Sequence, residues 1–413
     1  MARSHDMTSG SIWRSLLGFS IPIMISNLVQ STYNAVDMLF VGRFTGTESL
    51  AAVSVCGPIL NVMIITLSGM SAGVLVVISG LLGAGDIKQA QDAAHTSVAL
   101  YALMAAVMTV LGLLFVPQIL RLVQTPAAAM PEAKRYLYTV FAGTVFTFGY
   151  NLIGALQRGL GNAAASMSFV IISSAANIAL DAVFIVWLGM GAFGAALGTV
   201  LSQVAAFVIG TVQFARGGAA LRLSARAVRF HKKHLKNILL FGVPTALNEV
   251  MVNLAMLTVS GVANSFGLAS SAAYGVGSRI NSLAIFTDGA MNQTMSAYAS
   301  QNIGAGRQKR ALEGLWKAII LSAGAALGTS LLVLGFASEF SACFDSDPAV
   351  IEQSAAFLRV TVWSYPLFAT VGPLIGFIRG TGNVEASLLV GVVAQLCLSL
   401  IHISEPTRLL SIS

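Results

Sequence analysis

Four polar side chains recur at helical spacing in the apolar segment 21–43. They are Asn27, Gln30, Asn34 and Asp37. Spacings of three and four residues place them on one face of an α-helix, and apolar side chains cover much of the rest. A carboxylate in the middle of a membrane helix costs on the order of 2.5–3.5 kcal/mol on insertion scales, so it usually faces the protein interior and has a function. Asp37 is therefore the first candidate to bind a cation.

Two later apolar segments carry polar groups that suit the same chemistry. Asn177 and Asp181 lie four residues apart and share a helix face, and Thr199 and Gln203 do the same on the next segment. At a rise of 1.5 Å per residue, Asp37, Asp181 and Thr199 lie roughly 8–12 Å from their nearest external turns. All three are therefore expected at similar depth.

Two carboxylates with an amide and a hydroxyl at one level suit Na⁺ or a shared proton. We predict that Asp37, Asn177, Asp181 and Thr199 form a cation site, in which Asp37, Asn177 and Asp181 would hold a sodium ion. The sequence leaves both Na⁺ and H⁺ open as the coupling ion, and no other cofactor is expected. The alternative is that neighbouring helices satisfy each acid separately as a structural group.

The second half of the chain has polar groups of its own in apolar segments. Glu249 and Asn253 are four residues apart, and Asp288 lies in a later segment. The candidates for a substrate cavity or for coupling are Asn27, Gln30, Asn34, Gln203, Glu249, Asn253 and Asp288. Arg279 with Asp288 is also interpretable as a structural ion pair. His95, close to a helix start, is interpreted as an interfacial residue rather than a proton carrier.

The composition indicates which elements must position these residues. The 413 residues are 56% hydrophobic and only 9% charged, whereas soluble domains have about 25% charged residues. Hydrophobic runs of about 20 residues recur, each long enough to cross a hydrocarbon core. The predicted spans are 13–41, 51–80, 94–116, 134–157, 163–187, 191–215, 237–264, 270–300, 311–336, 354–378 and 384 onward. The three cysteines have no metal-site spacing, and no cleavable signal peptide is evident.

The distribution of basic residues predicts the orientation. With the N-terminus inside, the internal segments carry fifteen Lys and Arg residues and the external loops carry four. The positive-inside rule therefore places the N-terminus in the cytoplasm. Seven of the basic residues lie between Arg216 and Lys236, a stretch that we interpret as a cytoplasmic linker and not as a nucleic-acid-binding segment.

An internal repeat divides the chain into two halves. Phe19-Ser-Ile-Pro22 matches Phe241-Gly-Val-Pro244 at an offset of 222 residues. The Gly-Ala-Gly motif at 83–85 recurs at 304–306, and Arg-Gly-x-Gly-Asn at 158–162 recurs at 379–383, both at an offset of 221. Each half is therefore expected to have about six spans, related by an axis along the membrane normal. We read the glycines of the two later motifs as helix caps rather than phosphate cradles.

The repeat also predicts the domain boundaries. They are a cytoplasmic N-terminus at 1–12, an N-lobe at 13–216, the basic linker at 217–236, an incomplete C-lobe at 237–397 and a tail at 398–413. The counterpart of the sixth span should end near residue 437, and 398–408 resembles the translation of a sequencing-library adapter. We therefore expect the tail to be non-native and the last one to two spans to be missing or replaced. His402, Glu405 and Arg408 receive no functional interpretation.

These features resemble the bacterial members of the multidrug and toxic compound extrusion (MATE) family. The resemblance covers about 12–397 and rests on Pro22, Asp37, the Val-Gly-Arg43 run with Leu50-Ala-Ala, and the two pairs of glycine motifs. It implies an all-α polytopic membrane protein of twelve helices in two pseudo-symmetric six-helix lobes. It also implies export of cationic or amphipathic compounds in exchange for Na⁺ or H⁺.

The resemblance extends to the candidate site. One branch of the family uses an acid on the first span, Asn-x-x-x-Asp on the fifth and a Thr on the sixth, roles that map onto Asp37, Asn177, Asp181 and Thr199. Another branch relies on an acid in the tenth span, and 362–378 has none here. Glu249 resembles the seventh-span acid of that branch only loosely, because its distance from the proline differs.

The sequence therefore predicts a monomeric secondary antiporter of the bacterial inner membrane, working on small cationic or amphipathic substrates within the lipid bilayer. No motif favours an enzyme. The main alternative is a lipid-linked oligosaccharide flippase of the same superfamily, which would need a basic cavity to hold pyrophosphate. A non-transporting membrane scaffold is the second alternative, although it gives no reason for buried acids.

Overall fold

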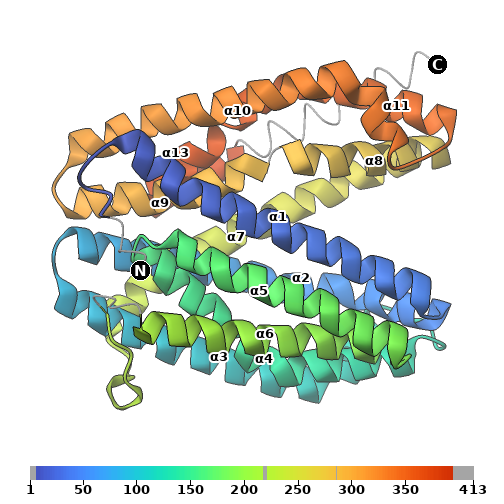
Figure 1. The fold of residues 1–413 in the computed structure, drawn as a ribbon, viewed down its shortest axis with the longest axis horizontal. Coiled ribbons are helices and arrows are strands. Elements are labelled where there is room, and N and C mark those ends of the chain that lie inside the picture. Colours follow the sequence, from blue (N-terminus) through green and yellow to red (C-terminus); the bar gives the residue numbers. More distant parts are fainter. Residues whose placement is uncertain (1–5, 217–220, 285, 394–413) are drawn as a thin grey trace. The chain divides into compact units, whose positions relative to one another are not determined.

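The computed structural model describes residues 6–216, 221–284 and 286–393, and in this part of the chain it contains helices and no strand (Figure 1). The first half contains α1 (Ile12–Phe44), α2 (Thr47–Gly83), α3 (Ile87–Leu122), α4 (Met130–Gly159), α5 (Ala163–Asp181), η1 (Ala182–Trp187) and α6 (Gly191–Arg216). The second half contains η2 (Ala225–Ala227), α7 (Lys232–Ser265), α8 (Leu268–Ala284), α9 (Phe286–Gly304), α10 (Gln308–Ala342), α11 (Pro348–Thr361), η3 (Val362–Ser364), α12 (Tyr365–Phe368) and α13 (Val371–Gly380). The predicted tail at 398–413 lies outside the described residues.

The helices have the length and composition of membrane spans. Within the described residues, nine helical stretches are long and apolar enough to cross a bilayer, and Val384–Val393 is a shorter apolar helix. The prediction of an all-α polytopic membrane protein is confirmed. Most helices extend a few residues beyond the predicted apolar runs, because their ends carry polar residues that reach past the hydrocarbon.

Compact packing divides the chain into two units. Unit 1 comprises 1–6 and 21–243, and unit 2 comprises 7–20 and 244–413. The division falls inside two helices, one residue before Pro22 in α1 and directly before Pro244 in α7. The repeated proline motif therefore marks, in both halves, the point at which a helix passes from one unit to the other.

Hydrogen bonds and close packing support this division. The amide of Met7 donates to Gln301 Oε1 over 2.8 Å, and Arg310 donates to the carbonyl of Ser9 over 2.8 Å, so the segment before α1 is held by α9 and α10. In unit 1, a methyl group on Gly73 of α2 would overlap the carbonyl oxygen of Ile238, so the start of α7 packs directly on α2.

Small residues let the helices of unit 1 approach closely. A side chain on Gly143 would overlap Val200, and one on Gly149 would overlap Phe207, so α4 and α6 pack backbone against side chain. These two helices run side by side in Figure 1. The core around them includes fully buried aromatic rings such as Phe148. The result is a rigid frame that holds α5 against α6.

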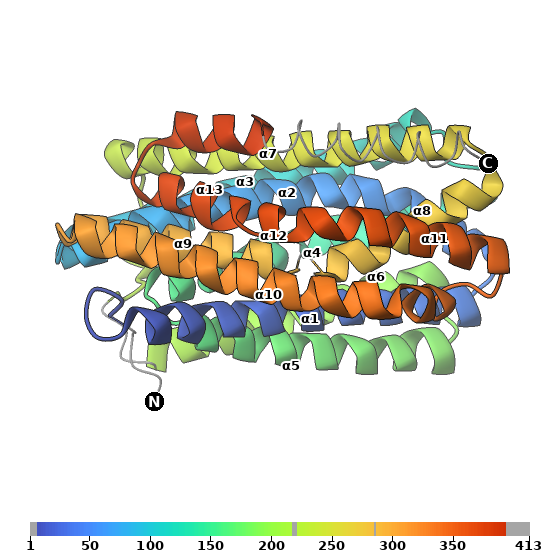
Figure 2. The ribbon, with the colours of Figure 1, turned by 90° about the horizontal axis from the view of Figure 1, so that it is seen from above.

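One predicted span of unit 2 is divided into several short helices. The span predicted at 354–378 is long enough to cross a membrane, but it is not one helix: α11, η3, α12 and α13 follow one another within it. Pro366 lies at the start of α12, where a proline ring is compatible with the first helical turn but not with continuation of the preceding helix. Figure 2 shows these short elements in sequence beside α9 and α10.

The repeated glycine motifs end helices, as predicted. Gly85, Gly161, Gly306 and Gly382 all have positive φ, between +72° and +94°. At the first of these turns the amide of Asp86 donates to the carbonyl of Leu81, which is the bond expected of a Schellman cap. Asp86 then accepts a hydrogen bond from the amide of Gln89, which lowers the pKa of Asp86 and starts α3.

Candidate functional site

The sequence of α5 places two predicted site residues on its buried face. Asn177 is 2% exposed and Asp181 is fully buried at the last turn of the helix. A π-helical turn, Ala182–Trp187, follows Asp181 directly, and the amide of Leu188 donates to the carbonyl of Val183. Such turns are rare and are found frequently at functional sites. The sequence predicted one span over 163–187 and gave no signal for this change of helix type.

The polar atoms of these residues are left without partners. Within the described chain, neither carboxylate oxygen of Asp181 and neither polar side-chain atom of Asn177 takes part in a hydrogen bond. The buried Oδ1 atom of Asp37 on α1 also has no hydrogen-bond partner among the described residues. Burying a polar group without a partner costs about 1–3 kcal/mol, and more for a charged group. A bound cation or proton would supply the missing interaction.

The two acids lie in one electrostatic neighbourhood in unit 1. The charge of Asp37 acts on Asp181, and both act on the buried Tyr136 of α4. The set of two carboxylates and one amide is rich in oxygen, which suits a hard monovalent cation or a proton. The chemistry of the donor set therefore fits the predicted ion.

Gly198 is a site residue that the sequence analysis missed. A methyl group at Gly198 of α6 would overlap Asp181 Oδ1, so α6 approaches the carboxylate with bare backbone at this position. Thr199 is the next residue on α6 and is half-buried. The run of small residues around 194–198 was the available signal, because small residues mark close helix approach in membranes.

A small cavity of about 20 Å³ lies next to Asn177, within unit 1. It is lined by Gln30, Tyr33, Tyr150, Val170, Ser173, Ser174, Asn177, Ser202 and Gln203. Two predicted residues, Gln30 and Gln203, are thus brought to the wall of this cavity, and Gln203 also accepts a hydrogen bond from Thr147. A volume of this size holds about one water molecule or a bare ion, whereas drug-sized ligands need roughly 300–1,000 Å³.

The other polar residues of α1 lie elsewhere. Asn34 is exposed and Asn27 is partly exposed, and neither lines the cavity beside Asn177. The predicted polar stripe of α1 is therefore split. Gln30 and the buried oxygen of Asp37 face the interior of unit 1, and Asn34 turns away from it.

The predicted residues of the second half all belong to unit 2. Asp288 Oδ1 accepts a hydrogen bond from the amide of Gly372 over 2.8 Å, at the start of α13. Asn253 donates to the carbonyl of Glu249 over 2.8 Å, within the same helix. The Arg279–Asp288 ion pair considered from sequence is absent from the described ion pairs, because Arg279 is exposed and Asp288 faces α13 instead.

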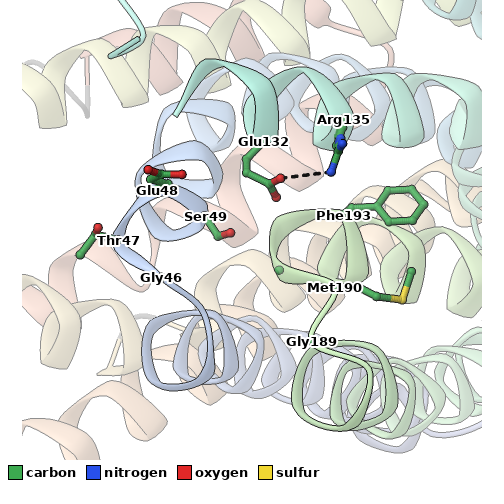
Figure 3. Close-up of a pocket in the computed structure, with 10 residues that line it drawn as sticks. Gly46, Thr47, Glu48, Ser49, Glu132, Arg135, Gly189, Met190 and Phe193 are labelled. Atoms are coloured by element: carbon green, nitrogen blue, oxygen red, sulfur yellow. Dashed lines mark ion pairs between the residues drawn. The ribbon is translucent and has the colours of Figure 1, made fainter. Parts of the chain in front are cut away.

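A second, wider pocket of about 600 Å³ opens at the N-terminal ends of α2, α4 and α6. Figure 3 shows Glu132 paired with Arg135. The two side chains lie 3.5 Å apart, and the hydroxyl of Ser49 packs against Gly191. Neither Asp37 nor Asp181 lines this pocket. It is therefore a feature of the helix ends and separate from the buried acids.

Comparison with known proteins identifies the family. The sequence matches MatE over residues 22–183 and 244–403, one match in each half of the repeat. The chain belongs to the MatE family. YoeA of Bacillus subtilis (strain 168), a probable multidrug resistance protein, is 29% identical over 397 residues, which cover 93% of this chain and 84% of YoeA. The multidrug export protein MepA of Staphylococcus aureus (strain N315) is 22% identical over 385 residues, covering 92% and 84%.

Solved structures of MATE transporters confirm the fold. A MATE crystal structure in complex with MaD3S has a TM-score of 0.89 with this chain at 23% identity, covering 100% of this chain and 99% of the other. An outward-facing multidrug resistance MATE transporter of the MOP superfamily has a TM-score of 0.87 at 23% identity, covering 100% and 98%. The predicted MATE fold class is confirmed, and this MatE protein is a member of a transporter family.

Proposed function

We propose that this MatE protein is a secondary antiporter that exports cationic or amphipathic compounds in exchange for Na⁺ or H⁺, with the ion held in unit 1. The observation that carries the proposal is the set of buried, unpaired polar atoms on Asp181, Asn177 and Asp37 among the described residues. Such a cluster is costly unless an ion or proton completes it. Thr199 would contribute its hydroxyl from α6, beside the close approach of Gly198 to Asp181.

In the proposed cycle, the cation enters from outside and neutralises Asp37 and Asp181. The outward-facing state then loses affinity for a positively charged substrate, which leaves. Coupling requires only that ion and substrate prefer opposite states or compete for the same charge. The size of the cavity beside Asn177 supports an ion and not a drug at this point of unit 1. The names of the relatives support small-molecule export.

The proposal includes a location. We assign the multi-pass chain to the bacterial inner membrane as a monomer with a cytoplasmic N-terminus, because the Lys and Arg residues gather on one set of connecting segments. The same rule places the basic linker, whose described part is 221–236, in the cytoplasm. Nucleic acid has no role in this proposal, and no enzyme chemistry is assigned.

The test is ion-driven transport in inverted vesicles by the protein completed with the span that the repeat predicts to be missing. A Na⁺ gradient and a pH gradient are imposed separately, and uptake of a fluorescent cation is compared for wild type and Asp181→Asn, with Glu352→Gln as the matched exposed-acid control. We expect uptake driven by one gradient, lost in Asp181→Asn and kept in Glu352→Gln. Uptake that survives Asp181→Asn would move coupling elsewhere, with Glu249 as the next residue. No uptake with either gradient would overturn antiport and favour a lipid substrate or a scaffold.

A further inference from the structure

The linker between the two halves is tied to the start of α3 by its backbone. Gln91 pairs with Arg222 twice: its Oε1 atom accepts from the amide of Arg222 over 2.7 Å, and its Nε2 atom donates to the carbonyl of the same residue. Leu221 is 1% exposed and packs into the core of unit 1. Further along, the amide of His231 donates to the hydroxyl of Thr96 over 3.2 Å. The segment 221–231, here called the strap, is therefore held at both ends.

The middle of the strap depends on a buried histidine. His95 is 5% exposed, and its Nε2 atom accepts from the amide of Ser224 over 3.3 Å. The side-chain amide of Gln91 lies 3.2 Å from the same nitrogen. A backbone amide can only donate, and the Nε2 atom of a protonated imidazole has no lone pair. The observed contact therefore requires neutral His95 with its proton on Nδ1.

A second histidine, on the strap itself, has a related dependence. His231 Nε2 accepts from Arg229 Nε over 3.0 Å and lies 3.6 Å from Asp92 Oδ1. Since an arginine side chain only donates, this contact also requires a neutral ring. On protonation, His231 would exchange Arg229 for an ion pair with Asp92. None of the contacts of His95 given above is with a carboxylate. Protonation of His95 would therefore remove its hydrogen bond with Ser224 and add no ion pair.

The elements packed against His95 carry charged groups of both signs. On the strap and the start of α7 most of them are cationic, and two carboxylates lie on α3 or just before it. They are Asp86, Lys88 and Asp92 near or on α3, Arg158 at the end of α4, Arg222, Arg226 and Arg229 on the strap, and Lys232, Lys233, His231 and His234 around the start of α7.

We propose that the strap is an acid-released clamp in which His95 is the proton-sensing residue. Histidine is the side chain whose charge ordinarily changes between pH 5 and 8, and the closed strap needs the ring of His95 neutral. At neutral pH the contact between Ser224 and His95 adds to the other contacts that hold the strap on α3, and acid removes this contact so that the strap opens more often. The inference does not depend on transport. In the orientation proposed above, the strap senses the cytoplasm.

Unit 2 contains a similar tether that provides an internal control. The segment before α1 is held by Gln301, Asn302 and Arg310, through bonds to Met7 and Ser9. These three side chains do not titrate between pH 5 and 8. The two tethers hold the residues before the first helix of each half, but only the strap has a histidine as an acceptor. Acid should therefore open one of them and leave the other closed.

The experiment is amide hydrogen–deuterium exchange of the full-length protein between pH 7.5 and 5.5, with each rate expressed relative to its intrinsic rate at that pH. For one histidine that must lose its proton to close the strap, the opening constant of 221–231 should rise about tenfold, and that of 7–10 should stay constant. His95→Gln keeps an acceptor oxygen that does not titrate, so its strap should stay protected at both pH values. His234→Gln is the matched control and should behave as wild type.

Three results would overturn the clamp. The first is equal strap protection in the wild type at the two pH values. The second is an acid response that persists in His95→Gln. The third is a parallel loss of protection at 7–10, which would indicate general loosening of the protein. If His95→Gln fails to fold, the wild-type protein still tests the proposal. The strap at 221–231 should lose protection in acid, and the segment 7–10 should keep it.

Discussion

Asp181 in unit 1 and Asp288 in unit 2 are both acids within segments that the sequence predicts to span the membrane, and their polar atoms have different partners in the structure. Asp288 accepts the amide of Gly372 at the start of α13, so it serves as a helix cap within unit 2. Both oxygens of Asp181 remain without a hydrogen bond in the described part of the chain. Burial alone therefore does not distinguish an acid that is available to an ion from an acid with a structural role. The informative feature is an acid that the protein leaves unsatisfied.

The surrounding helices differ in the same sense. In unit 1, α4 runs unbroken from Met130 to Gly159, and Asp181 of α5 packs against Gly198 of α6. In unit 2, the corresponding stretch is divided into α11, η3, α12 and α13. An interrupted helix exposes backbone groups that must find partners inside the membrane. Asp288 is one such partner, and so it is not free for an ion.

The largest expected effect follows from replacing Asp181. Asp181→Asn should lower ion-driven uptake at least about tenfold, and it should leave the thermal midpoint of the purified protein unchanged or raised, because it removes an unpaired buried charge. Transport assays and thermal unfolding of the same preparation check both expectations. A variant that transports normally, or that unfolds much earlier than wild type, would place Asp181 among the structural acids.

Asp288→Ala should show the reverse pattern. It removes the acceptor of the Gly372 amide and leaves a buried donor unpaired, at a cost of about 1–3 kcal/mol in stability. The thermal midpoint should fall, while the ion dependence of the remaining transport should match wild type. A shifted ion dependence at unchanged stability would contradict the assignment of Asp288 as a cap.

Two glycines provide a matched pair for a finer test. A methyl group on Gly198 would overlap Asp181, and a methyl group on Gly372 would overlap Asp288. Overpacking should cost each alanine variant about 1–3 kcal/mol. Only Gly198→Ala should also raise the ion concentration needed for half-maximal transport, since only it disturbs the proposed ion site. Equal ion dependence in the two variants would remove the distinction between the units.

The smallest effect is expected at Thr199. Thr199→Val deletes one hydroxyl, and one hydrogen-bond-sized interaction of about 0.5–1.5 kcal/mol corresponds to roughly a two- to tenfold change in apparent ion affinity. Thr199→Ser keeps the hydroxyl and should resemble wild type. The measurement is the ion dependence of transport. Identical curves for the Val and Ser variants would exclude Thr199 from the site.

The sequence predicted the class of fold and most helices well, because a run of about 20 apolar residues has few alternatives to a membrane span. It predicted the repeat and the glycine caps because the turns at Gly-Ala-Gly and Arg-Gly-x-Gly-Asn depend on the local sequence alone. It did not predict the division of 354–378. Pro22, Pro58, Pro117 and Pro244 all lie inside continuous helices, so Pro366 gave no reason to expect a break.

The candidate site could be predicted only in part, because it depends on contacts between helices that are distant in the sequence. Spacing placed Asn177 and Asp181 on one face, but it does not show whether a neighbour completes their hydrogen bonds. The packing of the neighbouring helix decides whether the hydrogen bonds are completed. The backbone of Gly198 packs against Asp181 without donating a hydrogen bond, whereas the amide of Gly372 donates to Asp288. The helical spacing in α1 also did not show that Gln30 would face the interior of unit 1 while Asn34 is exposed. Residues four positions apart lie close together on a helix surface, but their neighbours in the fold can differ.

The passage of α1 from one unit to the other has a consequence for biosynthesis. Met7 is hydrogen-bonded to Gln301, a residue 294 positions later in the chain. A ribosome therefore delivers the amino-terminal segment long before its partner exists, and closure of such distant contacts is slow. Residues that are made early are therefore among the last to dock. Until α9 and α10 have been inserted, the start of α1 has no native neighbour in unit 2 and depends on the translocation machinery or lipid to shield it.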